Sequence, residues 1–334
     1  MKFMFVTDTH ISGKNPICRL DNLVEVQFEK LKTLVSIANK LEAPIISAGD
    51  TFDGPNISYS TYTKLANVLK KCRYGFYTLY GNHDLQFHTM DSSNSVALGA
   101  LIESVPKVKH ISEFEFDHGI KIDYEDWSND KNIVDNNGEI LVCHRAIVNS
   151  KMVSRMWMKE NIIDFYMLGE VDKYELILCG HFHKQYEIVN SEKNTILNPG
   201  CFTRRNANNV ETHRPSYYVI ELDHSNFKYR LFSLPNSKRT EDVISDSHLT
   251  YTRMAKNIKG EIAGFFHKFK LSKDKNQFKG TLIKTFNELT EGHFKETIRE
   301  VLINVYENIE IGEFNNEVKR ISIPKRFDLK DRSK

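Results

Sequence analysis

The segment PIISAGDTFD, residues 44–53, decides the fold of the first half of the chain. Its apolar start has the length of a short buried strand, and that strand ends at a Gly-Asp pair. Two similar segments flank it: KFMFVT, residues 2–7, runs into Asp8, and GFYTLY, residues 75–80, runs into Gly81. We therefore predict three strands whose carboxyl ends carry acidic residues or glycine.

Two amphipathic helices are predicted between these strands. Residues 23–41 and residues 59–72 each place apolar side chains at helical spacing, for example at Phe28 and Leu31 in the first segment and at Leu65 in the second. A strand, helix, strand, helix, strand order predicts parallel strands that are joined by crossover helices. The fold class is therefore α/β.

Short apolar runs predict the remaining strands. The alternation Glu-Phe-Glu-Phe at residues 113–116 indicates a strand within residues 108–127. Residues 216–222 and 227–232 predict an antiparallel hairpin, because both are rich in aromatic and β-branched residues and a polar turn separates them. Three further strands are predicted at residues 139–143, 175–179 and 195–197.

The chain divides by composition near residue 240. Residues 1–233 form the predicted α/β domain, residues 234–247 are polar and are predicted as a linker, and residues 248–334 are predicted to be helical, with a helical hairpin at 282–309. Residues 251–334 contain 18 Lys and Arg residues against 12 Asp and Glu residues, whereas the rest of the chain contains 28 against 32. A basic C-terminal region either faces an anionic polymer or a partner, or is a solvated tail.

Cysteine usage and hydropathy indicate where the protein works. The five cysteines occur singly, which is typical of reduced thiols in a cytoplasm. The chain contains no apolar run of about eighteen residues, so we expect no membrane span. The first ten residues lack the cleavage region of a signal peptide. We therefore expect a cytoplasmic protein.

Five of the predicted strand ends carry residues that bind metal ions. The carboxyl ends of strands form the ligand-binding edge of an open α/β sheet, so these residues are expected to meet there. A single histidine after a strand is usually structural, but that interpretation does not account for five such groups. Carboxylate, imidazole and amide ligands suit two divalent cations such as manganese, iron or zinc. The groups are Asp8-Thr9-His10, Gly49-Asp50, Gly81-Asn82-His83-Asp84, Cys143-His144 and Gly180-His181-Phe182-His183.

Two of these groups hold ligand types two positions apart. Asp8 and His10 are expected to point the same way, because side chains alternate along a strand. His181 and His183 have the same spacing and are candidates for different ions.

In this order, the motifs D-x-H, GD-x-x-D, GNHD, H and GH-x-H resemble those of calcineurin-like metallophosphoesterases. The resemblance implies a four-layered α/β/β/α sandwich, to which the C-terminal region would add a helical appendage. It also implies two divalent metal ions bridged by Asp50, with His83 stabilising the transition state or protonating the leaving oxygen. By this resemblance the first ion is bound by Asp8, His10, Asp50 and His183, and the second by Asp50, Asn82, His144 and His181.

Finer motifs resemble the SbcD-type DNA double-strand-break repair nucleases, in the compact form that phages encode. Protein phosphatases of the superfamily carry Arg-Gly after the last Asp of the second motif, whereas Asp53 is followed here by Gly-Pro. The stretches LCGHFHKQYE, residues 178–187, and NPGCFTR, residues 198–204, are similar to the nucleases, apart from a Cys in place of the more usual Ser. Arg204 and Arg205 are candidates for contacts to DNA phosphates, or else for structural salt bridges.

The resemblance also implies partners. SbcD-type nucleases form homodimers and bind an SMC-like (SbcC-type) ATPase through a C-terminal helical hairpin, and the ATPase controls the access of duplex DNA. The predicted hairpin at residues 282–309 is the candidate for this element. Its apolar residues would otherwise form a small helical core.

We therefore expect a metal-dependent DNA nuclease, with exonuclease or endonuclease activity or both, that acts in recombination and repair. Two divalent ions, expected to be Mn²⁺, would be its cofactors. The alternative is a small-molecule phosphodiesterase or phosphatase with the same metal site, which would need a closed pocket and no ATPase partner. A catalytically inactive scaffold is a third interpretation, against which every expected ligand position is occupied.

Overall fold

The computed structural model describes residues 1–115, 120–127, 138–148, 174–189, 194–205, 214–223 and 226–249, together with the backbone of 162–164. The chain divides into two compact units, Met1–Thr252 and Arg253–Lys334. The predicted helical hairpin at 282–309 and the basic tail lie outside the described residues.

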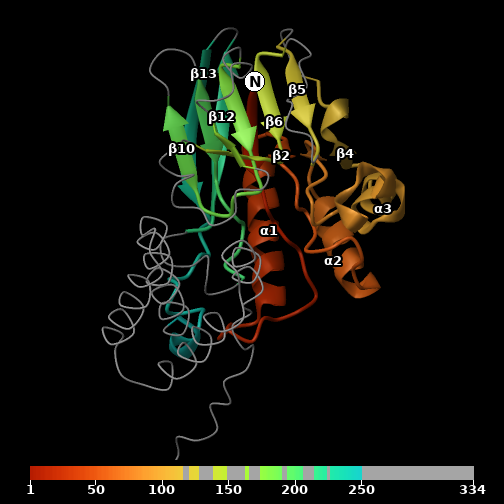
Figure 1. Cartoon of the computed structure of the whole chain (residues 1–334), viewed down its shortest axis with the longest axis vertical. Helices are drawn as coiled ribbons and strands as arrows, with labels where there is room; N and C mark the ends of the chain where they lie inside the picture. Colours follow the sequence, from red (N-terminus) through yellow and green to blue (C-terminus); the bar gives the residue numbers. More distant parts are fainter. Residues whose placement is uncertain are drawn as a thin grey trace, which may run out of the picture. The chain divides into compact units, whose positions relative to one another are not determined.

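The first sheet contains six strands (Figure 1). They are β1 (Lys2–Val6), β2 (Ile45–Ser47), β3 (Phe76–Thr78), β4 (Val108–His110), β12 (Ser216–Asp223) and β13 (Asn226–Ser233). Their order is β13-β12-β1-β2-β3-β4. Strands β1 to β4 run parallel, which confirms the predicted crossover arrangement. The predicted hairpin of β12 and β13 is also confirmed, and β12 runs antiparallel to β1.

Three α-helices pack on one face of this sheet (Figure 1). They are α1 (Leu23–Lys40), α2 (Tyr59–Leu69) and α3 (Ala97–Ser104). Helix α1 begins after Asn22, whose side chain accepts a hydrogen bond from the backbone N–H of Glu25 at 3.3 Å. The apolar faces of the helices share one core with Met4 and Val6 of β1. The first two helices were predicted, whereas α3 spans only eight residues and gives no clear periodic signal.

The second sheet contains five strands. They are β5 (Ile122–Glu125), β6 (Ile140–Cys143), β9 (Leu176–Cys179), β10 (Tyr186–Val189) and β11 (Thr195–Asn198). Their order is β10-β11-β9-β6-β5, and only β10 is antiparallel to its neighbour. Phe3 and Phe5 of β1 point away from the helices and share a second core with Val142 and Leu178 of this sheet. The expected α/β class with two packed sheets is confirmed.

Two short strands, β4 and β5, lie within the predicted range 108–127, but the alternating residues 113–115 belong to neither of them. Strand β4 ends at His110, and a 3₁₀ helix, η3 (Ile111–Glu113), follows it. The side chain of His110 accepts a hydrogen bond from the backbone N–H of Ser112 at 3.3 Å and so caps this short helix. The alternating residues that the structure describes, 113–115, therefore lie after the first sheet rather than in a strand.

The segment predicted as a linker, residues 234–247, packs onto the first unit. Val243 and Ile244 are buried in a small core with Cys18 and Leu249. The backbone N–H of Leu20 donates to the carbonyl of Val243 at 3.0 Å. This stretch is polar in composition, but its few apolar residues are enough to dock it, so it does not act as a free linker.

None of the described helices is long and apolar enough to cross a membrane.

Candidate metal centre

The chain turns sharply at the strand ends that carry the predicted ligands. Strand β1 ends at Val6, and Asp8, His10 and Asp50 adopt left-handed φ angles of 51°, 43° and 51°. The two turns run side by side, because His10 N–H donates to the Asp50 carbonyl at 2.9 Å. Asp8 and His10 therefore converge through strained turns, and their attribution to strand alternation is wrong. Such strain in non-glycine residues is typical of functional sites.

Gly81 allows two of these turns to meet. A Cβ atom at this position would lie 2.1 Å from Asp50 Oδ1 and 2.3 Å from the Asp50 backbone nitrogen. Real Cβ atoms do not approach other atoms so closely, so only glycine fits without displacing Asp50.

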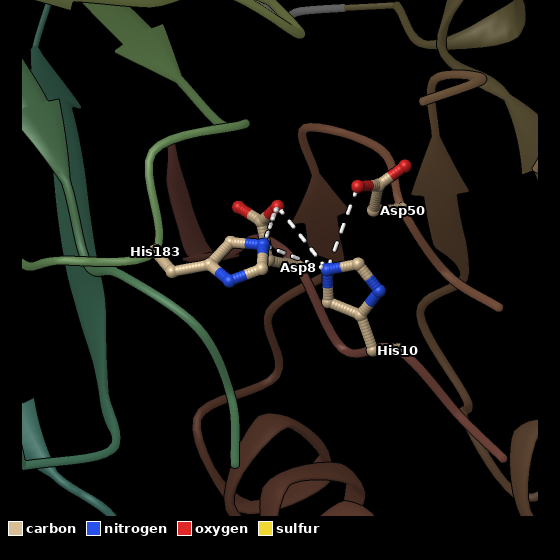
Figure 2. Close-up of side chains that lie close together, drawn as sticks. All are labelled: Asp8, His10, Asp50 and His183. Atoms are coloured by element: carbon tan, nitrogen blue, oxygen red, sulfur yellow. Dashed lines mark hydrogen bonds and ion pairs between the residues drawn. The ribbon is translucent and has the colours of Figure 1, made fainter. Parts of the chain in front are cut away.

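Four predicted ligands of the first ion lie together (Figure 2). The ligand atoms of Asp8, His10, Asp50 and His183 all lie within 4.8 Å of one another. Nε2 of His10 lies 3.0 Å from Nε2 of His183 and 3.5 Å from Oδ2 of Asp50. Nε2 of His183 lies 3.6 Å from Oδ1 of Asp8. Figure 2 shows the four side chains pointing toward one another.

This donor set fits a divalent cation. In the described part of the chain, Asp8 Oδ1 and Asp50 Oδ2 are buried and accept no hydrogen bond. Buried carboxylate oxygens that accept no hydrogen bond are costly, and a bound cation would satisfy them. Two carboxylates and two imidazoles are ligands that Mn, Fe and Zn accept.

The remaining predicted ligands form a second group that shares Asp50. Nε2 of His144 lies 3.4 Å from Asp50 Oδ2 and 3.2 Å from Asn82 Oδ1. Nδ1 of His181 lies 3.0 Å from the same Asn82 oxygen. The structure thus brings together all seven residues that the sequence proposed as metal ligands, with Asp50 between the two groups.

Further contacts orient these side chains. Nδ1 of His144 lies 2.5 Å from the Ala48 carbonyl, which leaves Nε2 directed at Asn82. The indole of Trp127 packs on the ring of His181, with centroids 4.8 Å apart. Sequence patterns gave no reason to place Trp127 at the centre.

Burial and charge set the protonation states of the centre. Burial alone would raise the pKa of Asp50, but His144 and His10 outweigh it and hold the pKa of this carboxyl well below its usual range. Burial would lower the pKa of His144, yet Asp50 and other partners raise it to about 9. Burial lowers the pKa of His181 to about 4. At neutral pH the Asp50 carboxylate is therefore ionised and the His181 imidazole is neutral, as metal ligands must be, whereas His144 has to lose a proton when it binds a cation.

His83 lies at the edge of the first group. Its backbone N–H donates to Asp50 Oδ1 at 2.8 Å, and its Nδ1 lies 3.2 Å from the Asp53 carbonyl. Its ring centroid is 4.7 Å from that of His10. Burial lowers the pKa of His83. The side chain is partly exposed, so it can reach a substrate.

Asp84 supports the centre without facing it. It is buried and accepts hydrogen bonds from the backbone N–H groups of Phe52 at 2.8 Å, Gly81 at 3.0 Å and Thr51 at 3.1 Å. Burial and the charge of Asp50 raise the pKa of Asp84 to about 7. Asp84 is part of the GNHD motif, but nothing in that motif indicates that it joins two turns.

The two candidate DNA contacts differ in their surroundings. Arg204 is buried, and its Nη1 donates to the Lys238 carbonyl at 2.6 Å. This favours the structural alternative for Arg204. Arg205 is partly exposed and forms an ion pair with Asp53, whose Oδ1 lies 3.5 Å from Nδ1 of His10. Arg205 is therefore the arginine that lies beside the metal groups.

The chain was compared with curated proteins and with solved structures. No curated protein shows significant similarity to it. Among solved structures, a dimetal phosphatase from Danio rerio is 10% identical with a TM-score of 0.48, covering 71% of this chain and 98% of its own. Wild-type Vps29 from Entamoeba histolytica, complexed with zinc, is 14% identical with a TM-score of 0.36, covering 71% of this chain and 96% of its own.

The family of the chain is shown by its sequence rather than by these structural similarities. A model of the calcineurin-like phosphoesterase family matches residues 1–185, and this stretch contains both metal groups. The chain therefore belongs to the calcineurin-like phosphoesterases, a family of metal-dependent hydrolases that act on phosphate esters.

Proposed function

We propose that this protein is a two-metal phosphodiesterase that cleaves DNA. The observation that carries the chemistry is the pair of donor groups that share Asp50. Asp8, His10, Asp50 and His183 would hold one ion, and Asp50, Asn82, His144 and His181 would hold the other. When bound, two divalent ions supply Lewis-acid activation and neutralise charge on the phosphoryl group. Among the metals that this donor set accepts, manganese is the proposed one.

His83 is proposed as the group that assists the leaving oxygen. The contact between its Nδ1 and the Asp53 carbonyl places a proton on Nδ1, so Nε2 is left for the substrate. When protonated, Nε2 would donate a hydrogen bond to the oxygen that develops negative charge. The hydrogen bond from its backbone to Asp50 fixes its distance from the ions.

DNA is the proposed substrate. This choice rests on the resemblance of residues 178–187 and 198–204 to the SbcD-type nucleases. The position of Arg205 adds support, since a guanidinium beside the metal groups is suited to a flanking phosphate. Its partner Asp53 keeps it in place until DNA competes for the ion pair. The excess of basic residues in 251–334 also suits an anionic polymer.

We further propose that the nuclease works as a homodimer with an SMC-like ATPase in recombination and repair. The C-terminal helical hairpin predicted at residues 282–309 would bind the coiled coil of that partner. These assignments rest on the resemblance alone.

One experiment tests the proposed activity. The purified protein with Mn²⁺ is offered linear duplex DNA, hairpin DNA, single-stranded DNA and bis(4-nitrophenyl) phosphate, and Asp50→Asn is the inactive control. We expect wild type to hydrolyse the simple diester and at least one form of DNA, and the variant to hydrolyse neither. Hydrolysis of the simple diester without cleavage of any DNA would favour the small-molecule phosphodiesterase instead. No hydrolysis of any substrate would favour the inactive scaffold.

A further inference from the structure

An unusual loop follows Asn82 and His83. Phe87 and His88 both adopt left-handed backbone conformations, with φ angles of 54° and 56°. Residues other than glycine rarely adopt this backbone conformation, which costs them about 1–2 kcal/mol each. In the described residues seven non-glycine positions have positive φ, and four of them lie in the two metal groups. The backbone strain of the site therefore continues into this loop.

The strained loop exposes an aromatic ring. Phe87 is 84% exposed, and its neighbour Met90 is 37% exposed. Leaving a phenylalanine in water forgoes about 1.5–3 kcal/mol of burial. Neither the left-handed backbone at Phe87 nor the exposure of its ring contributes to the stability of the folded protein.

Hydrogen bonds hold the loop that carries Phe87, and one of them joins it to the backbone of Asn82, a proposed metal ligand. Nδ1 of His88 lies 2.7 Å from the Asn82 carbonyl. The backbone N–H of Gln86 donates to Ser92 Oγ at 3.0 Å, and that hydroxyl donates to the Thr89 carbonyl at 2.7 Å. The loop is thus closed on both sides of Phe87. The bond from His88 joins the loop to Asn82, whose side-chain oxygen contacts both His144 and His181 in the second metal group.

We propose that Phe87 is the platform of a nucleobase-binding subsite. A base next to the phosphodiester at the metal centre stacks on its exposed ring. The proposal rests on the proposed nuclease function and adds a subsite to it. A phenyl ring cannot form hydrogen bonds with base edges, so it does not read sequence, and every base offers a π face. Stacking of this kind contributes about 1–3 kcal/mol per base.

The test is binding of a fluorescent single-stranded oligonucleotide, measured by anisotropy with EDTA present so that no cleavage occurs. Phe87→Ala is expected to weaken binding by about 5- to 160-fold. Phe87→Trp should bind as wild type, and Phe87→Leu, which stays apolar but loses the π face, should bind as weakly as Phe87→Ala. Tyr74→Ala is the matched control, because Tyr74 is 41% exposed and lies before β3, at the opposite end of that strand from Asn82.

A series of oligonucleotides with one abasic position locates the stacked base. Wild type should lose affinity at one position of the series, and Phe87→Ala at none. The Mn²⁺-loaded proteins are then compared on DNA and on bis(4-nitrophenyl) phosphate. If Phe87→Ala binds and cleaves every oligonucleotide as wild type does, the subsite is wrong and the nuclease function stands. If Phe87→Leu equals wild type, the contact is apolar and stacking is refuted. If wild type cleaves only the simple diester, the proposed function fails and the subsite fails with it.

Discussion

Replacing Gly81 by alanine should damage the metal centre more than the fold. The added Cβ would lie 2.1 Å from Asp50 Oδ1 and 2.3 Å from the Asp50 nitrogen, and a backbone atom cannot rotate away. Either the Asp50 turn or the loop that carries Asn82 must shift. Overpacking of this kind costs about 1–3 kcal/mol, which for a unit of this size lowers Tm by about 2–12 °C. Since Asp50 belongs to both groups, we expect the affinity for Mn²⁺ to fall by at least about 10-fold.

Gly54→Ala is the matched control for this substitution. A Cβ at Gly54 meets nothing within 4 Å, and the residue lies only four positions beyond Asp50. Both variants would be compared with wild type by thermal unfolding in EDTA and by calorimetric titration with Mn²⁺. Gly54→Ala should match wild type in both measurements. If Gly81→Ala also matched it, the close approach of the two turns would not be what shapes the centre.

Four further predictions concern single residues and the tail. His83→Ala should still bind both ions but lose about 10²–10⁴-fold in kcat, because we propose that His83 assists the leaving group; loss of an ion in metal analysis would mean that His83 is a ligand. Arg205→Ala should weaken DNA binding and reduce its salt dependence at unchanged Tm, whereas Arg204→Ala should lower Tm; the reverse pattern would contradict the assignment. Burial raises the pKa of Asp84 to about 7, so the folded state binds more protons than the unfolded state between about pH 4 and 7. The stability of wild type should therefore fall relative to that of Asp84→Asn as the pH rises through this window. Parallel curves of Tm against pH for the two proteins would refute this. Deleting residues 280–334 should leave hydrolysis of bis(4-nitrophenyl) phosphate intact and abolish binding to an SMC-like ATPase in a pull-down; if the truncated protein aggregates, the tail is a structural cap instead.

The sequence predicts the parts of this protein that depend on local pattern. The apolar runs before Asp8, Asp50 and Gly81 identify three neighbouring strands, because parallel strands joined by helices must end at one edge. The ligand types are also local, since each lies within a few residues of a strand end. That is why His144 and His181 could be identified as candidate ligands although neither lies near Asp50 in the chain, whereas their assignment to the second ion comes from the resemblance to calcineurin-like metallophosphoesterases.

What the sequence could not predict depends on contacts between distant segments. The left-handed turns at Asp8 and His10 exist because the neighbouring turn at Asp50 bonds to them, and no periodicity encodes that contact. An arginine such as Arg204 is expected to be exposed, but its side chain is buried and donates a hydrogen bond to the carbonyl of Lys238. The exposure of Phe87 could not be predicted either, because a large apolar side chain is expected to be buried.

The pairing of β1 with β12 has a consequence for the order in which the protein is made. The amino group of Met1 donates to the carbonyl of Leu222 at 2.7 Å, across a sequence separation of 221 residues. A ribosome needs about 10–45 s to synthesise that stretch. During this time one edge of β1 has no partner and can pair with the wrong strand. A nascent chain that ends before residue 216 already carries every proposed metal ligand and still exposes this edge, so metal binding cannot protect it from aggregation.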